Sequence, residues 1–343
     1  MKTLVGAPLM PAGYRQGGLD PPRMRATRDG LDVRMTEAAD VRANAISRPP
    51  TGDLALMAVA VVAISTSGPI IAAMAAPALA IALWRCVLGS GVTLLWVGAR
   101  HRAEVAGLSR QEWRWTVTAG LFLAAHFATW VPSLRFTSVA ASTALVATQP
   151  VWAALMARAQ GAYIDRRVWV GITISLVGVL VLTGIDFSLD PRSLIGDLLA
   201  LAGAILAAAY VTVGEKARQT VSTPVYTSVA YGVSAAALLP LCLLFGSALW
   251  GYSSRDWWLI LALTAGAQLL GHTLINRVLR TTSATVTSLA ILFEMPGATL
   301  IAAVWLGQVP PLAILPALGL LFVGLVLVIR AGDRRIPSET PPV

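Results

Sequence analysis

One carboxylic acid lies in the middle of a long apolar stretch of this chain. Glu294 sits between Phe293 and Met295 within residues 283–305, most of which are apolar. A charge at the centre of a bilayer costs about 2.5 to 3.5 kcal/mol, and loss of water favours the neutral acid. Glu294 could therefore bind and release a proton near neutral pH, which suits proton coupling. The alternative is a neutral or paired glutamate that fixes helix packing around Pro296.

A second charge inside an apolar run is an arginine. Arg85 lies several residues inside residues 78–98. An arginine at such a depth pairs with a carboxylate, binds an anionic group of a substrate, or extends its charged end to the membrane interface. Pairing with Glu294 would lower the cost of inserting both charges. The sequence leaves these three roles open.

Two histidines share helix faces with other polar or aromatic residues. His126 and Trp130 are four residues apart, as are His272 and Asn276, so each pair lies on one face of a helix. Both faces could line a central cavity, where imidazoles would serve as hydrogen-bond partners or proton relays. The alternative is that each histidine is a packing residue with its hydrogen bonds satisfied.

Gln149 and Tyr210 complete the set of polar side chains that are candidates for a solute site. Most tryptophans lie near the ends of apolar runs and are predicted to sit at the membrane interface. Trp84, Trp130 and Trp152 do not, and they are candidates for an aromatic wall around an organic solute. Plain packing is the alternative for these three.

Composition places these residues inside a membrane. Of 343 residues, 56% are hydrophobic and 13% are charged, and the mean hydropathy is +0.71. The net charge of +9 does not indicate nucleic-acid binding, because the arginines cluster between apolar runs and in the first fifty residues. Cys86 and Cys242 both lie within apolar runs, so we expect neither a disulfide framework nor a thiolate metal site.

Ten apolar runs are long enough to cross about 30 Å of hydrocarbon as helices. The sequence therefore predicts an all-α polytopic membrane protein with ten transmembrane helices. The predicted spans are 54–74, 78–98, 115–134, 139–157, 168–185, 196–214, 224–246, 257–276, 283–305 and 311–330.

The placement of Lys and Arg predicts how these spans are oriented. Cytoplasmic segments of membrane proteins carry the excess of both residues. With the amino terminus inside, every inner segment holds at least two of them, and the outer loops hold only Arg135, Arg192 and Arg255. We therefore expect a multi-pass protein of the inner (plasma) membrane with both termini cytoplasmic.

The apolar part of the chain repeats itself. Residues 134–138, Leu-Arg-Phe-Thr-Ser, recur 145 positions later at 279–283 as Leu-Arg-Thr-Thr-Ser, and the same offset carries Gln149 to Glu294. Because each repeat has five helices, an odd number, the second half must enter the membrane from the opposite side. The prediction is two inverted repeats, which can rock about a site held between them.

The repeat also divides the chain into parts. Residues 51–190 and 191–331 are predicted as the two five-helix units. Residues 1–50 are predicted to be a disordered cytoplasmic tail, in which Met35 is an alternative start, and residues 332–343 form a second cytoplasmic tail.

Several short motifs occur together in the two halves. They are Pro77 with Arg85, 134–140, Gln149 with Pro150, 196–199, 279–284, Glu294 and 306–308. Together they resemble EamA-type transporters of the drug/metabolite transporter superfamily, over about residues 52–330. Met295 stands where such proteins usually have a proline, and Gln308 stands where they often have an acidic residue. The resemblance implies export of amino acids, related metabolites or drug-like compounds, although similar proteins also catalyse uptake.

Secondary transport accounts for more of these features than other classes of function. The only lysines, Lys2 and Lys216, lie outside any Gly-x-x-x-x-Gly-Lys motif of an ATP-driven pump, and no His-Glu-x-x-His pair indicates an enzyme. A structural or partner-binding membrane protein is the alternative. We expect a small organic solute to bind near the midplane, between the third, fourth, eighth and ninth spans, and to move by alternating access. The lipid bilayer is the other expected partner, with no cofactor, metal or nucleic acid.

Overall fold

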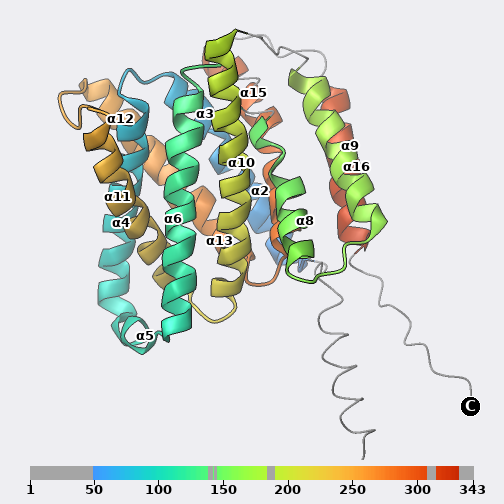
Figure 1. The fold of residues 1–343 in the computed structure, drawn as a ribbon, viewed down its shortest axis with the longest axis horizontal. Coiled ribbons are helices and arrows are strands. Elements are labelled where there is room, and N and C mark those ends of the chain that lie inside the picture. Colours follow the sequence, from blue (N-terminus) through green and yellow to red (C-terminus); the bar gives the residue numbers. More distant parts are fainter. Residues whose placement is uncertain (1–48, 138–141, 143–144, 184–189, 307–313, 332–343) are drawn as a thin grey trace, which may run out of the picture. The chain divides into compact units, whose positions relative to one another are not determined.

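The structure, a computed structural model, describes residues 49–137, 142, 145–183, 190–306 and 314–331. Within these ranges the regular structure is helical, and no strand occurs. The two predicted tails apart from residues 49 and 50, the alternative start Met35, and Gln308 lie outside the described residues. The helices in chain order (Figure 1) are α2 (Thr51–Ser65), α3 (Ser67–Ala72), α4 (Ala78–Arg100), α5 (Arg102–Gly107), α6 (Arg110–Ser133), α8 (Gln149–Ala159), α9 (Arg166–Thr183), α10 (Pro191–Arg218), α11 (Thr223–Leu244), α12 (Ser254–Leu263), η1 (Thr264–His272), α13 (Thr273–Val278), α14 (Ala284–Ile291), α15 (Glu294–Leu306) and α16 (Ile314–Ala331).

Five helical segments of the described chain are long and apolar enough to cross the hydrocarbon core of a membrane. They are Thr51–Ala72, Ala78–Arg100, Pro191–Arg218, Thr223–Leu244 and Ser254–Val278, with lengths from 22 to 28 residues. Of the other helices, α6 begins with a charged turn, α8 has 11 residues, and α9, α15 and α16 adjoin residues outside the described ranges. A total of ten spans therefore stays a prediction.

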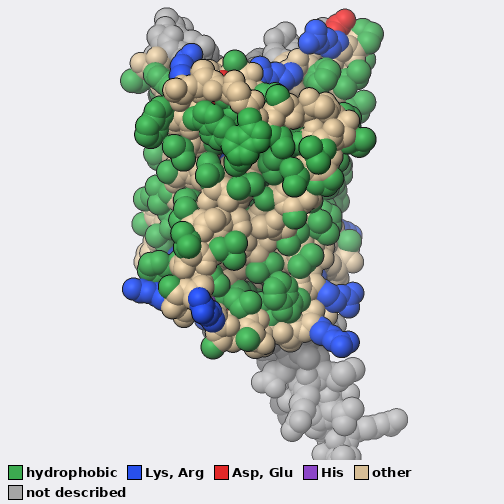
Figure 2. Space-filling view, turned by 90° about the vertical axis from the view of Figure 1, so that its left-hand side faces the viewer, with side chains coloured by type: hydrophobic (Ala, Val, Ile, Leu, Met, Phe, Trp, Pro, Cys, Tyr) green, Lys and Arg blue, Asp and Glu red, His purple; other side chains and the backbone are tan. Residues whose placement is uncertain are grey.

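The outer surface of these helices is apolar. Figure 2 shows hydrophobic side chains over the middle of one face, with Lys and Arg gathered toward its two ends. Large apolar side chains are exposed on the helices of that side, among them Leu95 on α4, Leu244 on α11 and Trp258 on α12. Exposed apolar area of this extent is unusual in a soluble monomer and suits contact with lipid.

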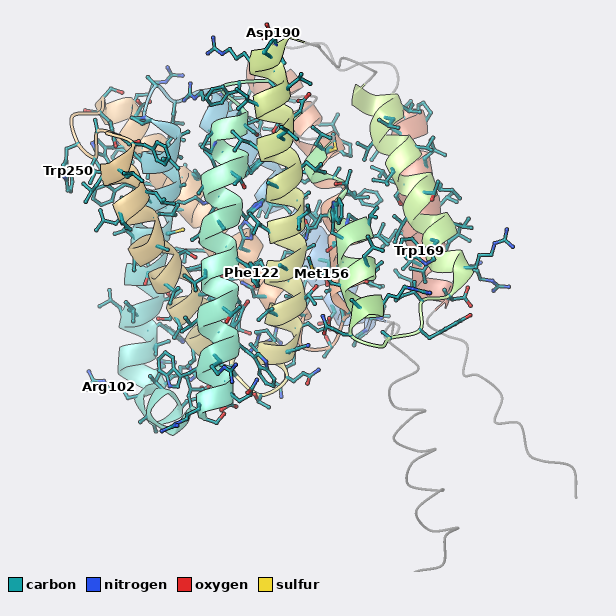
Figure 3. The ribbon with its side chains drawn as sticks, viewed as in Figure 1. Arg102, Phe122, Met156, Trp169, Asp190 and Trp250 are labelled. Carbon is teal, nitrogen blue, oxygen red and sulfur yellow. The ribbon has the colours of Figure 1, made fainter. Side chains whose placement is uncertain are left out.

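The two halves of the chain pack against each other in reciprocal pairs. The first helix of each predicted repeat contacts the third helix of the other, because α2 packs on η1 and α13, and α10 packs on α6. The second helices, α4 and α11, pack together, and so do the fifth helices, α9 and α16. Arg102 follows α4 at one end of the bundle and Trp250 follows α11 at the other end, so α4 and α11 run antiparallel (Figure 3).

The ninth predicted span, 283–305, is not one continuous helix. α14 ends at Ile291 and α15 begins at Glu294. Pro296 explains the break, because proline has no N–H group and its ring clashes with the carbonyl group four residues earlier. That carbonyl, of Leu292, instead accepts a hydrogen bond from the Met295 N–H at 3.3 Å.

The fourth predicted helix is broken at the corresponding place. Residues 147–148 form a turn, and α8 begins at Gln149 with Pro150 in its first turn. Gln149 and Glu294, which the repeat offset relates, are therefore each the first residue of a half-helix.

The eighth predicted span is helical but is not a regular α-helix, because α12 continues into the π-helix η1 before α13. Its counterpart in the first repeat, α6, is capped by Ser109 and Leu134. The second-half helix runs from its cap Ser253 to its cap Leu279 and is one residue longer. A π-turn closes its hydrogen bond over one more residue than an α-turn, so the wide turn accommodates the extra residue.

Glycine allows α9 and α16 to approach closely. A Cβ atom added at Gly324 in α16 would lie 2.5 Å from the Gly171 carbonyl oxygen in α9 and would overlap Ser175 Oγ. A Cβ atom at Gly171 would lie 2.6 Å from Val328 Cγ2. Figure 1 shows this helix pair at one edge of the bundle. Small residues therefore hold the pair together by van der Waals contact, as in other membrane helix pairs.

We expect Gly324→Ala to destabilise the protein by about 1 to 3 kcal/mol, because the added methyl group forces α9 and α16 apart. Gly319→Ala in the same helix is the matched control, since a Cβ atom there meets nothing within 4 Å. Thermal unfolding of both variants in detergent measures the difference. Equal melting temperatures would contradict the close packing of the two helices.

Candidate functional site

Arg85 is fully buried in the interior of α4. Its Nε donates a hydrogen bond to Gln268 Oε1 at 2.9 Å, and its guanidinium carbon lies 4.4 Å from the centroid of the Phe127 ring. Neither Nη1 nor Nη2 has a hydrogen-bond partner among the described residues. Complete burial contradicts the possibility that this side chain extends to the membrane interface.

Gln268 belongs to the π-helix η1 and is itself held from a third helix. The Tyr231 hydroxyl of α11 donates to the Gln268 carbonyl oxygen at 3.1 Å and lies 3.3 Å from Thr273 Oγ1. A wide turn leaves backbone carbonyl groups accessible to such side-chain donors. Gly89 of α4 allows the close approach, because a Cβ atom there would lie 3.1 Å from Gln268 Cγ.

Phe127 of α6 connects Arg85 with both candidate histidines. Its ring centroid lies 5.2 Å from that of His126 and 5.9 Å from that of His272. His126 stacks on Trp130 at 5.6 Å with an interplanar angle of 7°, as their shared helix face predicts. His126 Nδ1 lies 2.9 Å from the Gly203 carbonyl oxygen, which can only accept, so Nδ1 carries the hydrogen.

Glu294 is the carboxylate that interacts electrostatically with the Arg85 guanidinium group. Its side chain is partly exposed, and Arg85 is the charge that acts on it in return. Arg85 and Glu294 do not form a direct ion pair. Among the described residues, the pair with a nitrogen and an oxygen atom within 4.0 Å of each other is His101–Glu104. Two opposite charges from different halves of the chain therefore interact at longer range.

We use the name Arg85 cluster for Arg85, Phe127, His126, Trp130, Gln268 and His272.

Tyr210 and Asn276 form a neighbouring polar group. The Tyr210 hydroxyl donates to Asn276 Oδ1 at 2.8 Å, and the Asn276 carbonyl oxygen accepts from Arg218 Nε at 2.8 Å. His272 contacts α6 through Phe127, and Asn276 contacts α10 through Tyr210. Both residues of this predicted pair therefore face the packed helices α6 and α10.

Gln149 and Trp152 lie on the half-helix α8. Gln149 Nε2 donates to Ser288 Oγ of α14 at 3.0 Å, which joins the two broken helices. Trp152 Nε1 donates to Thr148 Oγ1 at 3.1 Å, one turn earlier in the chain. Contact of either side chain with a solute stays a prediction.

Trp84 lies in a separate aromatic group. Its Nε1 donates to the Leu249 carbonyl oxygen at 2.8 Å. Its ring meets those of Trp250 and Trp257 edge-on, with centroids 4.5 Å and 5.2 Å away. Trp84 therefore packs with tryptophans that the sequence assigns to the membrane interface, and its contact with a solute stays a prediction.

Three residues around Arg85 are not among the candidates that the sequence indicated. Phe127 and Tyr231 resemble ordinary apolar or aromatic packing residues, and only their contacts distinguish them. Gln268 did carry a signal, because it is an amide in an apolar run four residues before His272, and thus near the same helix face.

Comparison with known proteins agrees with this architecture. The family model described as EamA-like transporter family matches residues 51–184 and 194–330, one match in each half. The chain belongs to the EamA-like transporter family. EamA-like proteins are transporters rather than enzymes, and family membership together with the apolar helices makes this chain a multi-pass membrane protein.

Comparison with solved structures supports the fold but does not indicate a function. One solved structure, described as "Crystal structure of protein", is similar to this EamA-like chain with a TM-score of 0.70 at 19% sequence identity. It covers 83% of this chain and 100% of its own. A search of curated proteins finds no match.

We expect Gln268→Leu to destabilise this EamA-like protein by about 1.5 to 3 kcal/mol, because Arg85 Nε would lose its neutral acceptor inside the protein. Gln111→Leu, at an exposed position in the first turn of α6, is the control. Unfolding of the two purified variants in detergent, followed by circular dichroism, measures the effect. A Gln268→Leu variant as stable as the control would show that this hydrogen bond does not hold Arg85.

Proposed function

We propose that this protein is a secondary transporter that moves a small organic solute across the membrane by alternating access, with export as the physiological direction. The observation that carries the proposal is the pair of ionisable side chains, Arg85 and Glu294, inside apolar helices of a family of transporters. Intramembrane charges are costly and commonly mark the path of a solute or proton. A structural membrane protein needs neither charge.

The relation between the halves supports alternating access. Reciprocal packing of first on third helices, and of second on second, is what a two-fold relation between two repeats produces. The antiparallel course of α4 and α11 fits an inverted duplication with ten spans in all. In such an arrangement one set of helices can rock against the other, so that a site between them opens to each side in turn.

Glu294 is proposed to couple this motion to protons. It lies at the break between α14 and α15, and the residue is partly exposed. Apolar residues flank it in the chain, and Arg85 is a buried cation of the other half. A carboxyl group whose surroundings change as the halves rock can take up a proton in one conformation and release it in the other.

We expect Glu294→Gln in liposomes to lose solute transport driven by a pH gradient, because the amide cannot release a proton. Exchange of labelled for unlabelled solute should remain. The same substitution at Glu112, in the first turn of α6, is the matched control. The measurement is a screen of labelled solutes with and without the gradient.

Unchanged gradient-driven transport by Glu294→Gln would exclude this residue from coupling. If no solute moves under any gradient, a structural role gains support. Chemical conversion of a solute without movement would favour an enzyme.

The predicted topology gives a separate test. We expect Ser254→Cys to react with a membrane-impermeant maleimide on intact cells, and Gln111→Cys to react only after the cells are made permeable. Both positions are exposed, and the native Cys86 and Cys242 are buried and can be replaced beforehand. Labelling of both cysteines from the same side would refute the ten-span arrangement with cytoplasmic termini.

A further inference from the structure

We propose that Arg85 binds a carboxylate group of the transported solute, so that the solutes of this protein are carboxylate-bearing molecules with an apolar body. The proposal rests on the transport function proposed above and specifies the chemical class that the site accepts. It assigns Arg85 one of the three roles that the sequence leaves open.

The guanidinium group of Arg85 is held in a way that leaves the two Nη atoms of one edge without a hydrogen-bond partner within the described ranges. Gln268 Oε1 takes the Nε hydrogen, and the Phe127 ring provides a cation–π contact. An aromatic ring attracts the positive charge but does not satisfy hydrogens that lie in the guanidinium plane. Nη1 and Nη2 have no partner among the described residues although both are buried. Two parallel N–H donors of this kind match the two oxygens of a carboxylate.

Two further fully buried atoms of the Arg85 cluster that lack a partner among the described residues are also donors. Gln268 Nε2 and Trp130 Nε1 are buried and have no hydrogen-bond partner in the described part of the chain. The Gln268 amide orientation is fixed, because arginine can only donate to it. A buried donor left without an acceptor costs about 1 to 3 kcal/mol when it is neutral, so a group that supplies only acceptors is the complementary ligand. An ionised carboxylate is such a group.

A comparison within the chain shows that this arrangement is specific to Arg85. Arg218 is also buried, but its Nε donates to the Asn276 carbonyl oxygen and its Nη2 donates to Thr223 Oγ1, so that only its Nη1 lacks a partner among the described residues. Its guanidinium group therefore joins α10 to neighbouring backbone and side chains and serves packing. Arg85 has a single hydrogen bond and an aromatic neighbour, which orient it without using its paired donors.

The aromatic members of the Arg85 cluster indicate an apolar body for the solute. Phe127 contacts Arg85, His126 and His272, and His126 stacks on Trp130. Flat surfaces next to a charged group are suited to an aromatic or other apolar portion of a ligand.

Glu294 makes binding of such a solute depend on a proton. The titratable groups that act on Arg85, or on which Arg85 acts, are Cys86, His126, Tyr231, His272 and Glu294. Only Glu294 among them is negative when ionised near neutral pH. A solute carboxylate on Arg85 would face this second negative charge, so it binds best when the proton is on Glu294. Solute and proton then cross together, and the solute's own gradient drives export.

The test uses the purified full chain in detergent. The probes are benzoate, 3-phenylpropanoate and 4-phenylbutanoate, each paired with its neutral primary amide, and isothermal titration at pH 6 measures binding. We expect at least one acid to bind roughly tenfold or more tightly than its amide, because the amide lacks the charge and one of the two acceptor oxygens. The acids are ionised at both pH values used below.

Three variants test whether the preference for the acid over its amide depends on Arg85. Arg85→Gln should bind acid and amide equally. Arg85→Lys, which keeps the charge but loses the forked pair, should lower acid affinity and serves if the first variant does not fold. Arg100→Gln is the matched control, because Arg100 lies in the same helix and stacks on Trp96 at 4.5 Å but is exposed, and it should bind as the unaltered protein does.

The pH arm tests the role of Glu294. At pH 8 the acids should bind more tightly to Glu294→Gln than to the unaltered protein, because the amide removes the second negative charge. The proposal is overturned if no acid is preferred over its amide, if the preference survives Arg85→Gln, or if acids bind the unaltered protein more tightly at pH 8 than at pH 6. Transport in liposomes without acid selectivity would refute the carboxylate site alone, whereas selective binding without transport would refute the transport function alone.

Discussion

The buried positive charge of Arg85 constrains the rest of this structure. A guanidinium group that is fully buried inside apolar helices must be compensated locally, because it is removed from bulk water. The compensation comes from an amide in η1 and an aromatic ring in α6, and the amide is in turn fixed by a tyrosine in α11. Helices of both halves thus converge on one side chain. Any rocking of one half against the other must keep or replace these contacts.

Packing and chemistry are divided between different helices. α9 and α16 interlock through glycine and serine, and their contacts leave little freedom for either helix. Other helices are irregular instead: α8 and α15 begin at breaks, and η1, which contacts Arg85 through Gln268, is wide. Irregular backbone in a membrane is tolerated where other protein groups satisfy it. The wide turn carries Gln268, whose side-chain oxygen accepts the hydrogen bond of Arg85 Nε.

Charged residues in this chain were predictable because they contrast with their surroundings. Arg85 and Glu294 are conspicuous in apolar runs, and the four-residue spacing of His126 and Trp130 predicts a shared face that their stacking confirms. Other features depend on tertiary contacts. Gln268 matters because Arg85 and Tyr231 approach it from other helices, and a sequence pattern does not contain that information. Pro296 signals a break but not that Glu294 would be the residue starting the next half-helix.

The wide turn η1 also bears on how the two halves came to differ. Inserting one residue into a packed α-helix would rotate every later side chain by about 100° and bury the wrong face. A π-turn confines this change to its own few residues, so α13 can keep its contact with α10. The copies of the duplicated unit thus diverged in length as well as in residue type. The copy with the additional residue is the one that provides the buried cation with its amide partner.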